Sequence, residues 1–117
     1  MKRPERVEDY LEHIAEAIDR ATSYLQPIQD IEAFKKNPQA QDAVVRNIEI
    51  IGETVSKIGS AAPDFIKQHP ELPWAQMRGM RNVAIHEYFF MDLEIVWNTV
   101  KEDSPKLKQQ VDTLLKR

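Results

Sequence analysis

Apolar residues recur at intervals of three and four along most of this sequence, and that spacing limits the chain to packed helices. Near the N-terminus the repeat consists of Val7, Leu11, Ile14, Ile18, Ala21 and Leu25. Because an α-helix turns once every 3.6 residues, such positions form a single stripe that can be buried. Alternating β-branched residues are absent, and only three glycines occur in 117 residues. The sequence therefore predicts an all-α fold.

Prolines and capping residues divide the chain into the expected helices. The two longest are expected over Glu5–Gln26, opened by Pro4, and over about Pro38–Ile58, because proline is favoured in the first turn of a helix. The remaining expected features are a short helix capped by Asp30, a stop at Gly59–Pro63, a short piece over Asp64–His69, a helix from Pro73–Trp74, one capped by Asp92, and a last one restarting at Ser104–Pro105. Together they predict an antiparallel bundle of four to five helices.

Length and composition restrict the class of protein further. A chain of 117 residues is long enough for one core, so residues 1–117 are expected to form a single domain. No apolar run approaches the ~20 residues of a membrane helix, and no cysteine is present. A cytoplasmic protein without a membrane segment or a metal site is therefore expected. The formal charge of −3 means that any contact with nucleic acid needs a local cationic cluster.

The amphipathic stripes carry more apolar surface than one small bundle would need. The surplus lies at Leu107–Leu115, Tyr10, Tyr24 and Trp97. Burial of such surface against a second copy would remove it from water. Homodimerisation is the expected use of it.

Chemically active side chains are densest between residues 78 and 88. Arg81, Asn82, His86 and Tyr88 fall within eight positions, and Arg78 precedes them by one helical turn. Arginine donates paired hydrogen bonds to phosphate and keeps its charge, whereas histidine exchanges a proton near neutral pH. Arg81 and His86 together predict a site that handles a phosphodiester, although such residues are more often simple packing or surface groups.

The second long helix carries a further set of polar residues. Arg46 and Glu53 are seven positions apart and so share a helix face. Their neighbourhood favours two interpretations equally: ordinary surface pairing of Arg46 with Glu49 or Glu53, or a second wall of the phosphodiester site. His13, between Glu12 and Glu16, is interpreted as a surface or rim residue.

Taken in order, these pieces resemble the HEPN superfamily, and within it the HepT-like ribonuclease toxins. The signature is Arg81-Asn82-x-x-x-His86, extended by Glu87-Tyr88, and it follows Arg46-Asn47-Ile48-Glu49-Ile50-Ile51-Gly52-Glu53 and Trp74-x-x-Met77-Arg78-Gly79-Met80. The similarity runs from about Val7 to Leu107. Thr54 departs from it, since a small apolar residue is common after Ile-Gly-Glu.

The resemblance implies a homodimeric bundle in which two Arg/His motifs face a shared cleft and cut RNA without a metal or another cofactor. It implies catalytic roles for Arg81, His86 and Asn82, with Arg78, Arg46 and Glu53 as candidate substrate-binding residues. It also implies a minimal nucleotidyltransferase antitoxin of the HepT/MntA type, which in some systems transfers AMP to the tyrosine corresponding to Tyr88. Two other readings stay open: a non-catalytic module that binds a nucleotide or the nucleotidyltransferase, and a purely structural helical dimer.

Overall fold

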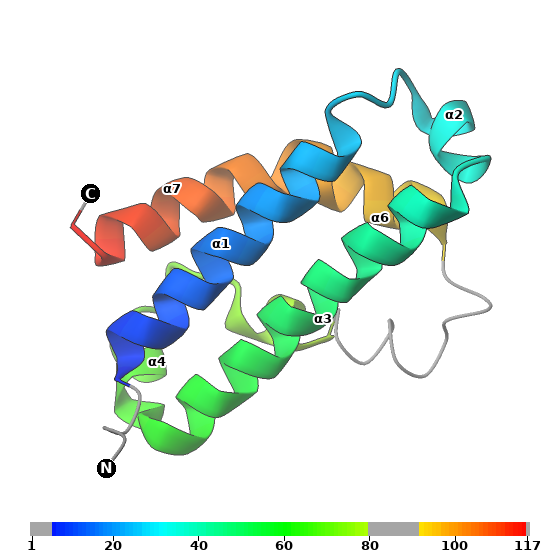
Figure 1. Cartoon of the computed structure of the whole chain (residues 1–117). Helices are drawn as coiled ribbons and strands as arrows, with labels where there is room; N and C mark the ends of the chain where they lie inside the picture. The colour runs from blue at the N-terminus through cyan, green and yellow to red at the C-terminus, as the bar shows by residue number, and fades with distance from the viewer. Residues whose placement is uncertain (1–5, 80–91, 117) are drawn as a thin grey trace, which may run out of the picture.

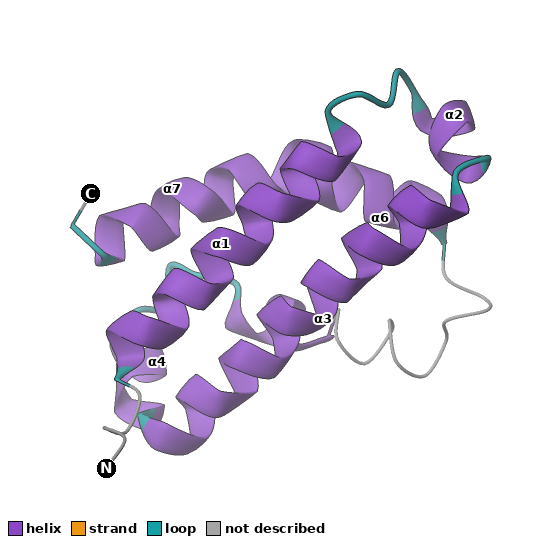
Figure 2. Cartoon of the chain, in the orientation of Figure 1, coloured by secondary structure: helices purple, strands orange, loops and turns teal. Residues whose placement is uncertain are grey.

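The computed structural model describes residues 6–79 and 92–116, and within these ranges the chain is helical with short connections (Figures 1 and 2). The elements in chain order are α1 (Val7–Leu25), α2 (Ile31–Lys35), α3 (Pro38–Ala61), α4 (Pro63–Gln68), α6 (Leu93–Asn98), the π-helix η2 (Thr99–Asp103) and α7 (Ser104–Leu114). Residues 74–79 are also helical. The predicted all-α helical fold is confirmed. No helix in the described ranges is long and apolar enough to cross a membrane.

Helix α1 begins at Val7 and follows the predicted stripe. The Arg6 backbone N–H donates to the Asp9 carboxylate at 2.8 Å, which satisfies a donor at the start of the helix. Its buried residues are Leu11, Ile14, Ala15, Ala17, Ile18, Ala21 and Leu25. The helix ends at Leu25, one residue before the predicted end.

Helices α2 and α3 are both capped as their sequences indicate. The Asp30 carboxylate accepts from the Ala33 N–H at 2.9 Å, and the Asn37 amide oxygen accepts from the Ala40 N–H at 3.0 Å. Helix α3 ends at Ala61, inside the predicted stop at Gly59–Pro63 and three residues beyond the expected end at Ile58. The residue before a proline is driven out of helical geometry, so Pro63 sets the end: Ala62 has φ −148° and ψ 67°.

The predicted start of the last helix at Ser104–Pro105 is confirmed, since α7 begins at Ser104, but it follows α6 and η2 without an interruption. The chain stays helical from Leu93 through Leu114, and Thr99–Asp103 forms a π-helical turn just before the proline. A proline has no N–H and its ring clashes with the carbonyl four residues earlier in a regular α-helix. The wider turn, in which the Ser104 N–H donates to the Thr99 carbonyl, accommodates Pro105 without a break. The predicted Asp92 cap is confirmed by its 2.9 Å bond from the Glu94 N–H.

Two hydrophobic cores lie along the antiparallel pair α1 and α3, which make the most extensive contact between elements (Figure 1). The first core contains Leu11, Ile14, Ala15, Ala17, Ile18, Ile51, Val55, Ile58, Leu72, Trp74, Met77 and Val111. The second core contains Ala21, Leu25, Ile28, Phe34, Ala40, Val44, Ile48, Val96 and Val100. The first core involves α7 and the stretch around Trp74, and the second involves α2 and α6.

Much of the supposed surplus apolar surface is used inside the chain. Leu107, Leu114, Leu115 and Tyr10 pack against the first core, and Trp97 packs against the second, where its ring lies 5.6 Å from that of Phe34. Tyr24 stays 41% exposed. The surface that favoured a homodimer is therefore smaller than the sequence indicated. Trp74 is a core residue, and its indole N–H donates to the His69 carbonyl at 2.8 Å.

Candidate functional site

The motif residues Arg81, Asn82, His86 and Tyr88 lie outside the described residues. The structure does describe the chain on both sides of them. Before the motif, the helical segment 74–79 is anchored by Trp74 and Met77 in the first core. After it, Asp92 caps α6, whose Val96 is buried in the second core. The predicted motif is thus attached at each end to a different core.

Arg78, predicted to bind substrate, has its guanidinium beside the C-terminal part of α3. A Cβ atom at Gly59 would lie 3.0 Å from the Arg78 Nη2 atom and 3.6 Å from the Ile66 side chain. The absence of a side chain at Gly59 therefore leaves the room that the guanidinium occupies. Arg78 itself is exposed.

Arg46 and Glu53, the other predicted substrate-binding residues, lie further along α3. Arg46 is exposed and pairs with Glu49 at 3.5 Å, as one of the two interpretations held. Thirteen residues separate Arg46 from Gly59, which corresponds to roughly 20 Å along the helix axis. The structure therefore does not gather Arg46 and Arg78 into one cluster within a single chain. Glu53 is half-buried between them.

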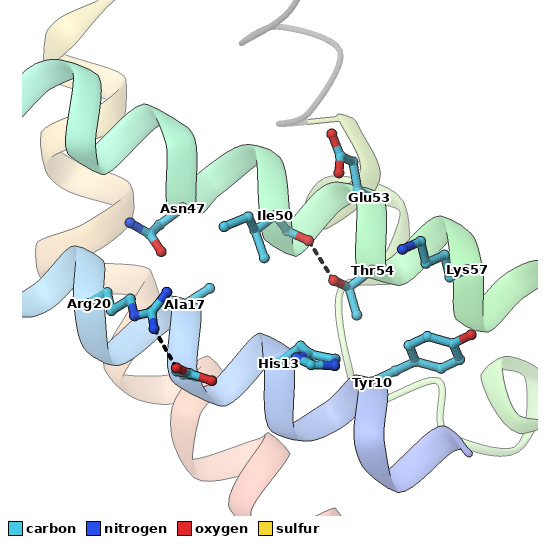
Figure 3. A pocket seen from close by; sticks show the side chains of 10 residues that line it. Tyr10, His13, Ala17, Arg20, Asn47, Ile50, Glu53, Thr54 and Lys57 are labelled. Carbon is cyan, nitrogen blue, oxygen red and sulfur yellow. Dashed lines mark hydrogen bonds and ion pairs between the residues drawn. The ribbon is translucent and has the colours of Figure 1, made fainter. Parts of the chain in front are cut away.

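A groove between α1 and α3 brings together side chains that the sequence did not connect (Figure 3). Its cavity has a volume of about 320 Å³. Two sets of four residues line its length, each with successive spacings of three, four and three: Tyr10, His13, Ala17 and Arg20 on α1, and Asn47, Ile50, Thr54 and Lys57 on α3. The helices are antiparallel, so Tyr10 faces Lys57, His13 faces Thr54, and Arg20 faces Asn47 (Figure 3).

The groove has a lining of mostly polar side chains, with Ala17 and Ile50 as its apolar members. Arg20 donates to Glu16 at 2.6 Å, and the Thr54 hydroxyl donates to the Ile50 carbonyl at 2.6 Å. Glu53 also borders the groove, but its carboxylate points away from α1 (Figure 3). A second hollow of about 390 Å³ continues past Tyr10 and Lys57 along Ser56, Ser60 and Ala61. The polar face of the α1–α3 pair is thus hollowed over much of its length.

Sequence reasoning missed this groove. His13 was interpreted as a surface or rim residue, and it is exposed, but it also lines the groove. The available signal was the identical three-four-three spacing on the two longest helices. That signal becomes informative only when α1 and α3 are known to be antiparallel neighbours in this register.

A small all-α protein with a polar groove between its two longest helices is the class that the described residues define. The family model described as "Ribonuclease HepT-like" matches residues 14–114, a range that includes the Arg81–Tyr88 motif. The chain belongs to this family.

Relatives agree with that assignment over nearly the whole length. "Probable ribonuclease HepT" of Thermococcus cleftensis is 44% identical over 99% of this chain and 100% of its own length. A protein of Caldanaerobacter subterraneus subsp. tengcongensis named "Putative RNase" is 36% identical over 92% of this chain and 93% of its own. A Methanocaldococcus jannaschii protein with the same name is 38% identical over 91% and 94% of the two chains. No solved structure gives a significant match.

Proposed function

We propose that this protein is an endoribonuclease toxin that cuts RNA through Arg81 and His86 without a metal ion. The observation that carries the proposal is membership of the ribonuclease HepT-like family together with an intact Arg-x4-His motif inside the matched range. The proposed substrate is RNA because its 2′-hydroxyl can act as an internal nucleophile.

In the proposed reaction the 2′-oxygen attacks the adjacent phosphorus while the bond from phosphorus to the 5′-oxygen breaks. The products are a 2′,3′-cyclic phosphate and a free 5′-hydroxyl. One proton leaves the 2′-hydroxyl and another reaches the departing 5′-oxygen, and His86 carries out one of these transfers. Arg81 holds the phosphate and stabilises the negative charge that grows on it. Asn82 orients His86 or the phosphate.

A second copy of the chain would complete the proposed site. Each copy supplies one motif histidine, whereas cleavage needs two proton transfers. Arg78 and Arg46 are both exposed and lie well apart within one chain, so either can contribute positive charge to a cleft shared by two copies. Such pairing would give a chain of net charge −3 a local attraction for RNA.

We also propose that a minimal nucleotidyltransferase acts as the antitoxin, through transfer of AMP from ATP to Tyr88. The phenolic oxygen would attack the α-phosphorus, with release of pyrophosphate. The bulky anionic group would then compete with RNA for Arg81. Mass spectrometry of the protein co-expressed with the nucleotidyltransferase should show one added AMP group, absent from Tyr88→Phe.

The decisive experiment compares induced expression of the wild type with His86→Ala. Growth arrest is expected on expression of the wild type. The purified wild type should cut RNA to leave cyclic-phosphate ends, and should do so in the presence of a chelator as well. Loss of His86 should lower the cleavage rate by about 10²–10⁴-fold, the usual contribution of a general acid or base. His69→Ala is the matched control, because His69 pairs with Glu71 in a connection outside the motif.

Equal cleavage by wild type and His86→Ala would reject the catalytic assignment. Absence of cleavage by an unmodified wild-type protein would favour the non-catalytic binding module instead.

A further inference from the structure

The proposed catalytic motif leaves the α1–α3 groove without an assigned function. Its residues come from the two longest helices, and none of Tyr10, His13, Arg20 and Lys57 belongs to the proposed catalytic set. From Asn47 to Lys57 the groove runs roughly 15 Å along α3, several times the ~3.4 Å rise per nucleotide of a stacked strand. An extended ligand of more than one unit therefore fits its shape.

Positive side chains mark the two ends of the groove. Arg20 stands at one end, oriented by its bond to Glu16, and its side chain is 54% exposed. Lys57 stands at the other end and is exposed, and within the described residues no hydrogen bond or ion pair engages its ammonium group. Cations at successive points along a groove are what a phosphate backbone requires.

Flat rings occupy the part of the groove near Lys57. Tyr10 faces Lys57, and His13 lies one turn further along α1 (Figure 3). Aromatic faces accept bases of any sequence by stacking, and a single-stranded nucleic acid exposes its bases for this purpose. The mixture of rings and cations suits a single strand better than a protein partner or a free phosphate.

Asn47 adds a buried acceptor that has no partner in the part of the chain that the structure describes. This residue is only 3% exposed, and its amide N–H donates to the Ala43 carbonyl at 2.8 Å. Its amide oxygen, directed toward α1 in Figure 3, has no hydrogen-bond partner among the described residues. Buried polar atoms of native proteins are nearly always paired, so an unpaired acceptor at a cavity indicates a ligand that brings a donor. The exocyclic amino group of adenine, cytosine or guanine is such a donor.

We propose that the α1–α3 groove binds the single-stranded RNA that flanks the cut phosphate. Lys57 and Arg20 contact backbone phosphates, Tyr10 and His13 stack on bases, and the Asn47 amide oxygen accepts from a base amino group once the Arg20 side chain turns toward a phosphate. The inference rests on the proposed ribonuclease function, and it adds a subsite and a base preference to it.

The first test is direct binding of an RNA oligonucleotide made uncleavable by 2′-O-methyl groups, followed by fluorescence anisotropy. Lys57→Ala and Arg20→Ala should each weaken binding about three- to tenfold. Each should also reduce the slope of log K against log salt by ~0.7, the effect of one lost phosphate contact on a single strand. Lys67→Ala on α4 removes an equal charge from an exposed site outside the groove and should bind as the wild type does. Unchanged affinity in both groove variants would overturn the proposal.

The second test concerns the base preference. Wild-type protein should bind uncleavable oligomers of A or C more tightly than those of N3-methyluracil, because that base has neither an amino group nor a ring N–H to donate. Asn47→Leu, which removes the unpaired acceptor with little change in volume, should abolish this preference while Tm stays the same or rises. A preference that persists in folded Asn47→Leu would remove Asn47 from the subsite.

Cleavage kinetics separate failure of this inference from failure of the proposed function. On a long RNA, the groove variants should raise KM with little change in kcat, whereas a dinucleotide substrate should show no difference from the wild type. Cleavage by the wild type with an unchanged KM in Lys57→Ala would reject the groove and leave the ribonuclease intact. Tight, groove-dependent binding by a wild type that cuts nothing would reject the ribonuclease and leave the groove.

Discussion

The two cores of this molecule share helices α1 and α3 but lie at different ends of the predicted catalytic segment. The first core holds Trp74 and Met77, which lead into residues 80–91, whereas the second holds Val96, just after those residues. Helix α1 contributes Ile14 to the first and Leu25 to the second, and both side chains are fully buried. The residues on either side of the predicted catalytic segment are therefore held by two separate clusters of contacts.

The largest expected effect comes from opening a cavity in either core. Ile14→Ala and Leu25→Ala should each lower the free energy of unfolding by about 2–5 kcal/mol, as large-to-small substitutions in well-packed sites do. Because α1 runs through both cores, each variant should still unfold in a single transition, measured by circular dichroism and fluorescence in urea. Two separate unfolding transitions, one shifted by Ile14→Ala and the other by Leu25→Ala, would show that the two cores unfold independently.

Loss of the α6 cap tests the attachment on the side of the second core. The Asp92 carboxylate accepts from the N–H groups of Glu94 at 2.9 Å and Ile95 at 3.4 Å. Asp92→Ala should cost about 1 kcal/mol in urea denaturation, the usual value of such a cap. It should also reduce RNA cleavage, because Asp92 directly follows residues 80–91.

Asp30→Ala is the matched control for that experiment. Asp30 caps α2 through the same kind of bond, and α2 also packs on the second core through Phe34. The stability cost should be similar, but cleavage at a temperature where both variants are folded should stay at the wild-type rate. Equal cleavage rates of Asp92→Ala and Asp30→Ala would show that catalysis does not depend on the cap of α6.

Gly59 offers a test on the side of the first core in which stability and activity change in opposite directions. Gly59→Ala should raise the free energy of unfolding by up to about 1 kcal/mol, because alanine is the better helix former. The new methyl group would lie 3.0 Å from the Arg78 Nη2 atom and would push the guanidinium aside. If Arg78 binds substrate, KM for RNA should rise several-fold while Tm increases. A rise in Tm with unchanged KM would remove Arg78 from the site.

The helices themselves could be predicted because their signal is local. The three-and-four spacing through Ile14, Ile18 and Leu25 and the caps at Asp30 and Asp92 act within a few residues of the chain. At Gly59 and Pro105 the exact course of the chain could not be predicted, because the effect of these residues depends on what surrounds them. A glycine can end a helix or can leave room for a neighbouring side chain within it. A proline can break a helix or can follow a π-helical turn without a break. Tertiary contacts decide which of these occurs.

The candidate site could likewise be predicted from the sequence only in part. The Arg81–His86 motif can be identified from residue types and order, since the proposed chemistry depends on those side chains. The separation of Arg46 from Arg78 depends on where the segment 74–79 lies against α3. The meeting of Tyr10 with Lys57 depends on how α1 and α3 pair. Only an approximate register could be inferred from the apolar stripes, because a shift of one turn leaves an apolar stripe buried but changes every polar neighbour.

The smallest expected effect is on the pairing of α7 with α1, a helix of both cores, where Lys108 of α7 reaches Asp19 on α1 at 3.4 Å and Asp112 at 3.3 Å. Burial lowers the pKa of the Lys108 ammonium, but the hydrogen bond to Asp112 and the charge of Asp19 outweigh this effect. The pKa of Lys108 is therefore raised above its usual value of 10.5. A raised lysine pKa contributes stability that is complete below 10.5 and disappears as pH rises through the folded-state value.

Lys108→Met, which keeps the apolar stem, should therefore cost no more than about 1 kcal/mol at pH 7. The difference from the wild type should vanish above the raised pKa, as measured by urea unfolding across pH. A difference in stability that persisted above this pKa would mean that Lys108 stabilises the fold through packing of its apolar stem rather than through its charge.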